Sequence, residues 1–153
     1  AGDAKVGEII GGSTKHGKEI KARFIGNCPG LKNLLDNLER QVERTGRIIL
    51  CDDARLIVSK PHTRLGFLLQ GDESRLMKKA SILTAYEVYK RNLDVLKAGD
   101  IHDEWQNDVL NGHVDEFTMD VCPPAFKQSG EFFNYKLPIA CDSKVGLTWA
   151  ETH

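Results

Sequence analysis

The sequence predicts an α+β protein in which helices pack on a small antiparallel sheet. Apolar residues recur at helical spacing in several stretches, for example at Leu31, Leu34, Leu35 and Leu38. Apolar triplets flank a turn within residues 47–58, a pattern typical of a hairpin. With 153 residues and 41% hydrophobic content, the chain is long enough to bury one modest core, and we expect a single domain over residues 1–153.

Residues 1–46 are expected to be helical. Two short helices should be separated near Gly11-Gly12-Ser13, because glycine interrupts an otherwise helical apolar pattern there. Asn27-Cys28-Pro29-Gly30 should be a turn, since Pro29 restricts one φ and Gly30 allows a positive one. A third, amphipathic helix should follow and end before Gly46.

Residues 47–112 are expected to hold a hairpin, a long helix and a metal-binding turn. Pro61 should end the hairpin of residues 47–58, and a helix should run from about Thr63 to Asn92, unbroken or broken once near Gly71. Further on, His102-Asp103-Glu104 should occupy a tight turn between two short strands. The candidate core positions of the long helix are Leu68, Leu69, Leu76, Ala80, Leu83 and Val88.

Residues 113–153 are expected to form a C-terminal helix and a strand. Pro123-Pro124 should break any helix that begins at Val114, and a second helical piece should run from about Ala125 to Phe133. The stretch from Tyr135 to Ile139 has the composition of a strand, and Pro138 would confine that strand to an edge or an end.

Charge and cysteine usage narrow the class of protein. Residues 1–100 hold 18 Lys/Arg against 13 Asp/Glu, and residues 101–153 hold 3 against 9. The basic N-terminal part could bind a polyanion and the acidic C-terminal part a divalent cation, although chance segregation of surface charge explains the counts equally well. The absence of a C-x-x-C pair and of a long apolar run indicates a soluble protein whose cysteines are free thiols; these are Cys28, Cys51, Cys122 and Cys141.

The Asp103-Glu104 pair is the candidate metal site. Carboxylate oxygens suit Mg²⁺, which keeps several waters beside one or two carboxylates. An isolated acidic pair is common in proteins of this size, so its chemistry alone is not specific. A zinc site built from His102, His113 and Cys122 would be a different possibility, but their spacing matches none of the short-paired zinc patterns.

Four motifs, in order along the chain, resemble those of bacteriophage-type family A DNA polymerases. Residues 1–7 are similar to the stretch after the fingers helix, and residues 60–71 to a segment that contacts the primer-template duplex. Residues 101–104, Ile-His-Asp-Glu, look like the metal-binding hairpin of the palm. Residues 145–153 look like the tryptophan-containing, histidine-terminated tail of the phage members. The resemblance implies a partial polymerase palm with the base of the fingers.

The resemblance implies a role for each matched residue. Asp103 would be the second catalytic aspartate and would bind two Mg²⁺ ions, Glu104 would assist it, and His102 would support the turn or the primer end. Gln70 would probe the minor groove near the primer terminus, although a glutamine there can also bond only locally. Backbone contacts to DNA would come from His62, Lys60, Arg64, Lys78 and Lys79, the last two of which can equally be a solvated helix face.

The resemblance also implies what else the reaction needs. The first catalytic aspartate and the fingers residues that bind the deoxynucleoside triphosphate lie before Ala1 in the family, so we expect no polymerase activity without that N-terminal portion. The expected location is the cytoplasm of an infected bacterial host, and exposed apolar surface predicts self-association of the isolated chain. A non-catalytic duplex-DNA-binding module is the alternative, whereas a nuclease would need more carboxylates.

Overall fold

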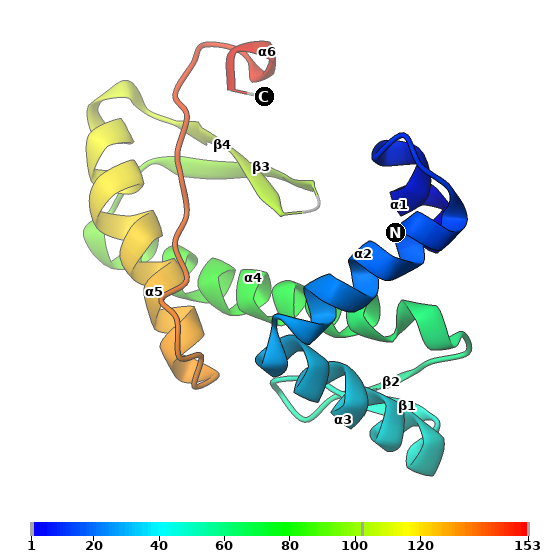
Figure 1. Ribbon diagram of the computed structural model, residues 1–153. Helices are drawn as coiled ribbons and strands as arrows, with labels where there is room; N and C mark the ends of the chain where they lie inside the picture. The colour runs from blue at the N-terminus through cyan, green and yellow to red at the C-terminus, as the bar shows by residue number, and fades with distance from the viewer. Residues whose placement is uncertain (1, 102, 153) are drawn as a thin grey trace. The chain divides into compact units, whose positions relative to one another are not determined.

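The chain folds into two compact units. The structure, a computed structural model, describes residues 2–101 and 103–152 (Figure 1). The first unit comprises residues 1–48 and 55–67, and the second comprises residues 49–54 and 68–153. Fold class is confirmed: the chain is helix-rich with two small two-stranded antiparallel sheets. Among the described residues, no helix is both long and apolar enough to cross a membrane.

Three helices make up most of the first unit: α1 (Asp3–Ile9), α2 (Thr14–Gly26) and α3 (Pro29–Thr45). Ser13 caps α2, because its Oγ accepts from the backbone N–H of His16 while His16 Nδ1 accepts from the N–H of Ser13. The expected break at residues 11–13 is thus confirmed. The turn expected at Asn27-Cys28-Pro29-Gly30 is confirmed in its first half, since Asn27 and Cys28 separate α2 from α3. Its second half is wrong, because Pro29 occupies the first turn of α3, where its missing N–H costs nothing.

Helices α1 and α2 approach each other closely at two glycines. A Cβ added to Gly17 would overlap the carbonyl oxygen of Asp3 and would lie 2.6 Å from the backbone nitrogen of Gly7. Lys21 adds an ion pair, with its Nζ 2.7 Å from Asp3 Oδ1. Glycine at position 17 therefore lets the two helices pack backbone against backbone.

Gly17→Ala is expected to lower the free energy of unfolding by about 1–3 kcal/mol, because the new methyl group must push α1 away from α2. Gly26→Ala, in the last turn of the same helix, is the matched control, since a Cβ there would meet nothing within 4 Å. Urea denaturation followed by circular dichroism measures both. Equal transition midpoints for the two variants would contradict the close packing.

The predicted hairpin forms after α3, with strands β1 (Arg47–Ile49) and β2 (Arg55–Ile57). Gly46 ends α3 in the left-handed conformation, with φ of 66°, and its N–H donates to the carbonyl of Val42 at 2.7 Å. The residues that connect the strands, 50–54, belong to the second unit, together with Ile49 at the end of β1. The chain returns through a short 3-10 turn, Pro61–Thr63, into the longest helix.

Helix α4 (Arg64–Arg91) has 28 residues and no interruption, so Gly66 and Gly71 do not break it. A glycine in a helix interior costs only about 1 kcal/mol, and the contacts of a long helix outweigh that amount. Of the predicted core positions, Ala80 is fully buried, but Leu69 is 57% exposed and does not belong to the core.

Strands β3 (Val95–Ile101) and β4 (Glu104–Val109) form the second hairpin, as predicted. They pair antiparallel, and the register runs from Val95 opposite Val109 to Ile101 opposite Glu104. The register shifts once, between Lys97 and Gly99, where Ala98 is an extra residue and makes a β-bulge. In Figure 1 this hairpin runs beside α4.

Pro123-Pro124 does not break the helix that precedes it, contrary to the prediction. Residues Glu116–Val121 form a π-helical turn that leads directly into α5 (Cys122–Phe132), which has the prolines in its first turn. The N–H of Cys122 donates to the carbonyl of Phe117, five residues earlier. The wider π turn leaves room for proline rings that would clash with the preceding turn of an α-helix.

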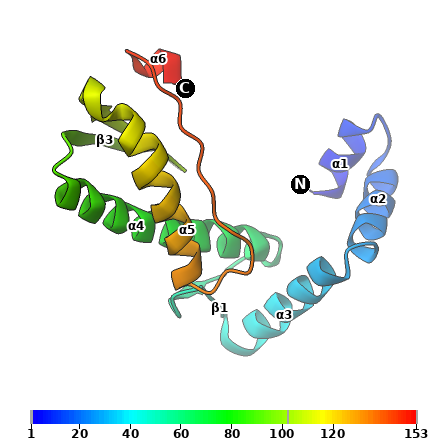
Figure 2. The ribbon, with the colours of Figure 1, turned by 90° about the vertical axis from the view of Figure 1, so that its left-hand side faces the viewer.

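The predicted strand over residues 135–139 does not form. This segment has no regular structure and runs along α5 (Figures 1 and 2), toward the short helix α6 (Trp149–Thr152). Gly130 allows the approach, because a Cβ there would lie 2.6 Å from Cγ1 of Ile139. The segment packs on a helix, so its backbone has no neighbouring strand to pair with, and Pro138 removes one donor in any case.

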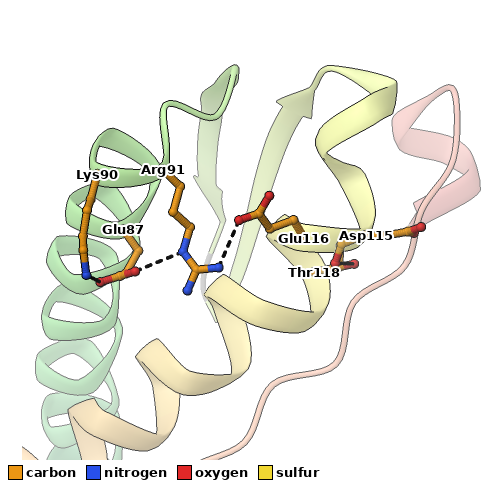
Figure 3. A network of polar contacts seen from close by, with 6 residues as sticks. All are labelled: Glu87, Lys90, Arg91, Asp115, Glu116 and Thr118. Carbon is orange, nitrogen blue, oxygen red and sulfur yellow. Dashed lines mark hydrogen bonds and ion pairs between the residues drawn. The ribbon is translucent and has the colours of Figure 1, made fainter.

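The core of the second unit lies where α4, the β3–β4 hairpin and the π turn meet. Phe117, Val121 and Cys122 are buried there, and the residues packed against them are Val88, Leu93, Val95, Val109 and Cys141. At the rim, the guanidinium of Arg91 joins α4 to the π turn (Figure 3), with Nη1 3.0 Å from Glu116 and Nε 3.1 Å from Glu87. The hydrogen bonds that Arg91 donates to Glu116 and Glu87 raise the pKa of its guanidinium.

Candidate functional site: a groove between helix α4 and the β3–β4 hairpin

The tip of the β3–β4 hairpin carries the predicted metal-binding residues. Ile101, the last residue of β3, pairs with Glu104, the first residue of β4. Asp103 lies in the turn between these strands and is exposed, whereas Glu104 begins β4 and is half-buried. His102, predicted to support the turn, lies outside the described residues. Because Asp103 is exposed, a cation with bound waters could reach its carboxylate.

Glu104 is oriented by its neighbours on the same strand. The amide of Gln106 donates to Glu104 Oε1. The hydroxyl of Thr152, in helix α6, donates to Gln106 Oε1 at 3.4 Å. The C-terminal helix is thus connected to the hairpin through Gln106. A carboxylate held by an amide loses freedom, so Glu104 is less available than Asp103 to an incoming ion.

A groove of about 670 Å³ separates α4 from the hairpin, and it brings together three of the predicted site residues: Gln70, Lys78 and Asp103. Both walls lie in the second unit. The helix wall is one face of α4, formed by residues three or four positions apart. The complete lining is Gln70, Glu73, Ser74, Met77, Lys78 and Ser81 from α4, and Lys97, Asp100, Asp103 and Trp105 from the hairpin.

The charges of the groove favour a cation near the hairpin tip. Three carboxylates line the groove, Glu73, Asp100 and Asp103, against two ammonium groups, those of Lys78 and Lys97. Lys97 is already paired with Asp100 on the same strand. The groove therefore offers no uniformly positive surface to a polyanion, and a divalent cation would lower the repulsion between its carboxylates and a phosphate group.

The remaining predicted DNA contacts lie elsewhere. Lys79 points away from the groove lining, with its Nζ 3.8 Å from the centroid of the Phe132 ring. Lys60, His62 and Arg64 belong to the first unit, where Lys60 and His62 are exposed. Arg64 forms an ion pair with Glu39, 2.8 Å between Nη1 and Oε1, so its charge is engaged within that unit.

A polar cluster that was not predicted from the sequence involves Asp72 and Arg75 of α4. Asp72 accepts two hydrogen bonds at 2.8 Å, from the backbone N–H of Cys51 and from the hydroxyl of Tyr135. One turn further on, Arg75 Nε lies 2.8 Å from Asp52 Oδ2. Asp72 is only two residues from Gln70, so these bonds help to hold the part of α4 that lines the groove. No sequence motif or residue spacing predicts such contacts, because the residues are far apart in the chain.

Burial raises the pKa of several groups in the second unit. The pKa of Cys51 rises to about 11, mainly because the thiol is desolvated and also because the Asp72 carboxylate is near. Burial raises the pKa of Cys122 to about 12. The same cause, with the hydrogen bond to Asp72 second, raises the pKa of Tyr135. All four cysteines of the chain are free thiols, as predicted.

These shifts predict an alkaline loss of stability. A group whose pKa is raised by folding stabilises the fold below its ordinary value, here 9.0 for cysteine, and loses that contribution as pH rises through the folded value. The free energy of unfolding should thus fall between about pH 9 and pH 12. Cys122→Ala should flatten this decline, as measured by urea denaturation at a series of pH values. An equal slope in both proteins would contradict the buried thiol.

The donor set of the groove suits a hydrated, oxygen-bound cation. Among residues 2–101 and 103–152, no group of three or more His, Cys, Asp or Glu side chains is arranged to hold a metal ion by itself. His113, considered above for zinc, instead accepts the backbone N–H of Asp94 at Nδ1, at 2.8 Å. One or two carboxylates with water suit Mg²⁺, which relies on further ligands from its substrate.

Comparison with known proteins supports the polymerase resemblance. The chain is 30% identical over 162 residues to a DNA-directed DNA polymerase of Escherichia phage Phieco32, and 29% identical over 173 residues to that of Enterobacteria phage T3. Both matches cover 100% of this chain, but only 26% and 25% of the relatives. The chain thus spans about a quarter of the length of the relatives it matches. No family model matches it.

The fold is also that of a known polymerase domain. The POL domain of Pol1 from M. smegmatis, solved with DNA primer-template and dNTP, matches 83% of this chain with a TM-score of 0.73. The match covers 24% of that domain's chain at 16% identity, so it bears on the fold alone. Over its whole length this chain is similar in sequence to phage DNA-directed DNA polymerases, of which it spans about a quarter, and over most of its length it has the fold of a polymerase POL domain.

Proposed function

We propose that this chain is a C-terminal fragment or subunit of a DNA-directed DNA polymerase for phage DNA replication. It would contribute an Mg²⁺-binding carboxylate and primer-template contacts to nucleotidyl transfer. The observation that carries the proposal is the groove in which Asp103, at the hairpin tip, and Gln70, on α4, line the same space. The whole-length similarity to phage polymerases supports it.

Each groove residue has a chemical task in this proposal. Asp103 and Glu104 provide carboxylate oxygens, and Mg²⁺, when bound, neutralises charge on the triphosphate and on the attacking oxygen. The amide of Gln70 can donate to purine N3 or pyrimidine O2 in the minor groove, acceptors that do not depend on sequence. In the reaction, the primer 3′ oxygen forms a bond to the α-phosphorus, and the bond to pyrophosphate breaks.

The positively charged side chains would bind the DNA backbone. Lys78 borders the groove, so it is the natural partner of a phosphate next to the primer end. His62, Lys60, Arg64 and Lys79 are proposed for phosphates further along the duplex. Arg64 would have to exchange Glu39 for a phosphate, which makes it the weakest of these assignments energetically.

The proposal predicts that the chain works only with the remaining portion of a polymerase. One carboxylate cluster cannot position a triphosphate, and this chain spans about a quarter of its relatives. The test mixes the chain with that portion, taken from a phage relative, and measures Mg²⁺-dependent primer extension. Extension by the mixture, with none by either part, would support the proposal; no extension despite measured association of the parts would refute it.

A non-catalytic duplex-DNA-binding module is the second candidate, because Gln70 and Lys78 face the groove whether or not a metal binds. It predicts binding that weakens steeply with salt. The two functions separate in Asp103→Ala, which should leave such binding intact while it abolishes extension.

A further inference from the structure

Lys97 stands at the centre of the groove's polar contacts. Its Nζ donates to Ser81 Oγ on α4 at 3.1 Å, and it forms an ion pair with Asp100 on its own strand. The same ammonium lies 4.4 Å from the centroid of the Trp105 ring, on β4. The groove separates α4 from the hairpin. The Lys97 side chain thus contacts residues on both sides of it: one on the helix and one on each strand of the hairpin.

Lys97 also lies where the hairpin bends. It is the last residue before the bulge, since it pairs with Asn107 while Gly99 pairs with the next residue, Gln106. A β-bulge bends its strand and increases the local twist, so the direction of the strand beyond it is set at this point. The portion beyond the bulge leads to the turn that carries Asp103.

The contact extends into the rest of the second unit. The indole of Trp105, under the Lys97 ammonium, packs against Phe126 of α5, with ring centroids 4.9 Å apart. Phe126 is itself buried. The hairpin is therefore held on one side by an aromatic pair and on the other by the hydrogen bond to Ser81.

We propose that Lys97 is a positioning residue: it fixes the hairpin tip against α4 and so sets the distance between Asp103 and Gln70. This inference rests on the proposed function, because it concerns the spacing of a metal-binding carboxylate and a DNA-probing amide. A one-ångström error in such spacing can slow an enzymatic step about 100-fold.

A lysine in a DNA-binding groove has an obvious second role, as a phosphate contact. The contacts of Lys97 argue against a phosphate-binding role, because Asp100 and the Trp105 indole already interact with its ammonium group. Only 31% of the side chain is exposed, which limits its access to a phosphate. Binding a phosphate would require Lys97 to leave these partners. Lys78, on the opposite wall, forms no ion pair with another of the residues that the structure describes, so it is the better phosphate ligand.

The first test reads the contact directly, without DNA or metal. Lys97→Met keeps the length of the side chain but removes its charge, and Lys97→Arg keeps the charge. In ¹H–¹⁵N spectra of the chain, the indole N–H signal of Trp105 should shift in Lys97→Met and move back toward its original place in Lys97→Arg. The other tryptophan, Trp149, is an internal reference. Lys90→Met, an exposed lysine paired with Glu87 on α4, is the matched control.

The second test measures extension with the remaining polymerase portion. Lys97→Met should lower kcat about 10- to 100-fold, with unchanged DNA affinity and an unchanged salt dependence of binding. Lys97→Arg should recover most of the rate, and Ser81→Ala should lose part of it. These variants keep the proposal testable even if Lys97→Met folds poorly.

Three outcomes would overturn the proposal: an unmoved Trp105 signal, an unchanged kcat, or a weaker DNA affinity whose salt slope falls by about 1, which marks a phosphate contact. If the unsubstituted chain supports no extension at all, the proposed function fails, whereas the Trp105 signal separately decides whether Lys97 holds the hairpin.

Discussion

Asp103→Ala is expected to lower Mg²⁺-dependent primer extension by at least about 10²–10³-fold in the presence of the remaining polymerase portion. Asp103 is the exposed carboxylate at the tip of the hairpin, and it lines the groove that Gln70 also lines. In the proposed function, its removal takes away oxygen ligands of Mg²⁺, the ion that would neutralise charge on the attacking 3′ oxygen. Rates from single-turnover extension, at saturating DNA, measure the effect on the chemical step itself.

The matched control is Asp108→Ala. Asp108 is also an exposed carboxylate of the β3–β4 hairpin, but it pairs with Leu96 near the base and does not line the groove. This variant should extend primers at close to the normal rate. Full activity of Asp103→Ala, with the Asp108 variant also active, would end the assignment of the metal ligand. Duplex affinity should be the same in all three proteins within about twofold, since surface changes away from contacts have small effects.

Phe117→Ala is expected to lower the free energy of unfolding by about 3–5 kcal/mol, the usual cost of deleting a buried aromatic ring. Phe117 is 4% exposed and forms the buried cluster with Val121 and Cys122. A loss of this size is a large part of the total stability of a typical domain, about 5–15 kcal/mol. Urea denaturation monitored by circular dichroism and by tryptophan fluorescence measures it.

Met119→Ala controls for the unusual backbone around Phe117. Met119 lies in the same π-helical turn, Glu116–Val121, but its side chain is 69% exposed. Its replacement should change stability by no more than about 0.5 kcal/mol. A similar loss in both variants would mean that the turn, and not the buried ring, carries the stability.

Local patterns were sufficient for most of the secondary structure. The third helix was predicted from the spacing of its leucines and from Gly46, and both features reappear in α3 and its left-handed end. The hairpin that carries Asp103 was predicted as a tight turn between two short strands, and the pairing of Ile101 with Glu104 bears it out. These features depend on residues a few positions apart, which is the range over which helix periodicity and turn preferences act.

The errors came from segments whose structure depends on distant partners. Pro123-Pro124 predicted a broken helix, but a π-helical turn before Cys122 accommodates the prolines while Phe117 and Val121 remain buried. The residues after Tyr135 predicted a strand, but they pack on α5 beside Gly130 instead of pairing with a sheet. In both places tertiary packing outweighed the local preference.

By itself, the sequence determined the helices, the two hairpins and the acidic turn, because each arises from neighbouring residues. Only the tertiary structure decided that one face of α4 lies across a groove from the hairpin, so that Gln70 and Asp103 share it. It also decided that Lys97 connects the two walls through Ser81. Contacts between residues so far apart in the sequence depend on how whole helices and strands pack. The spacing of residues within one helix or strand does not predict which of its faces will contact another element.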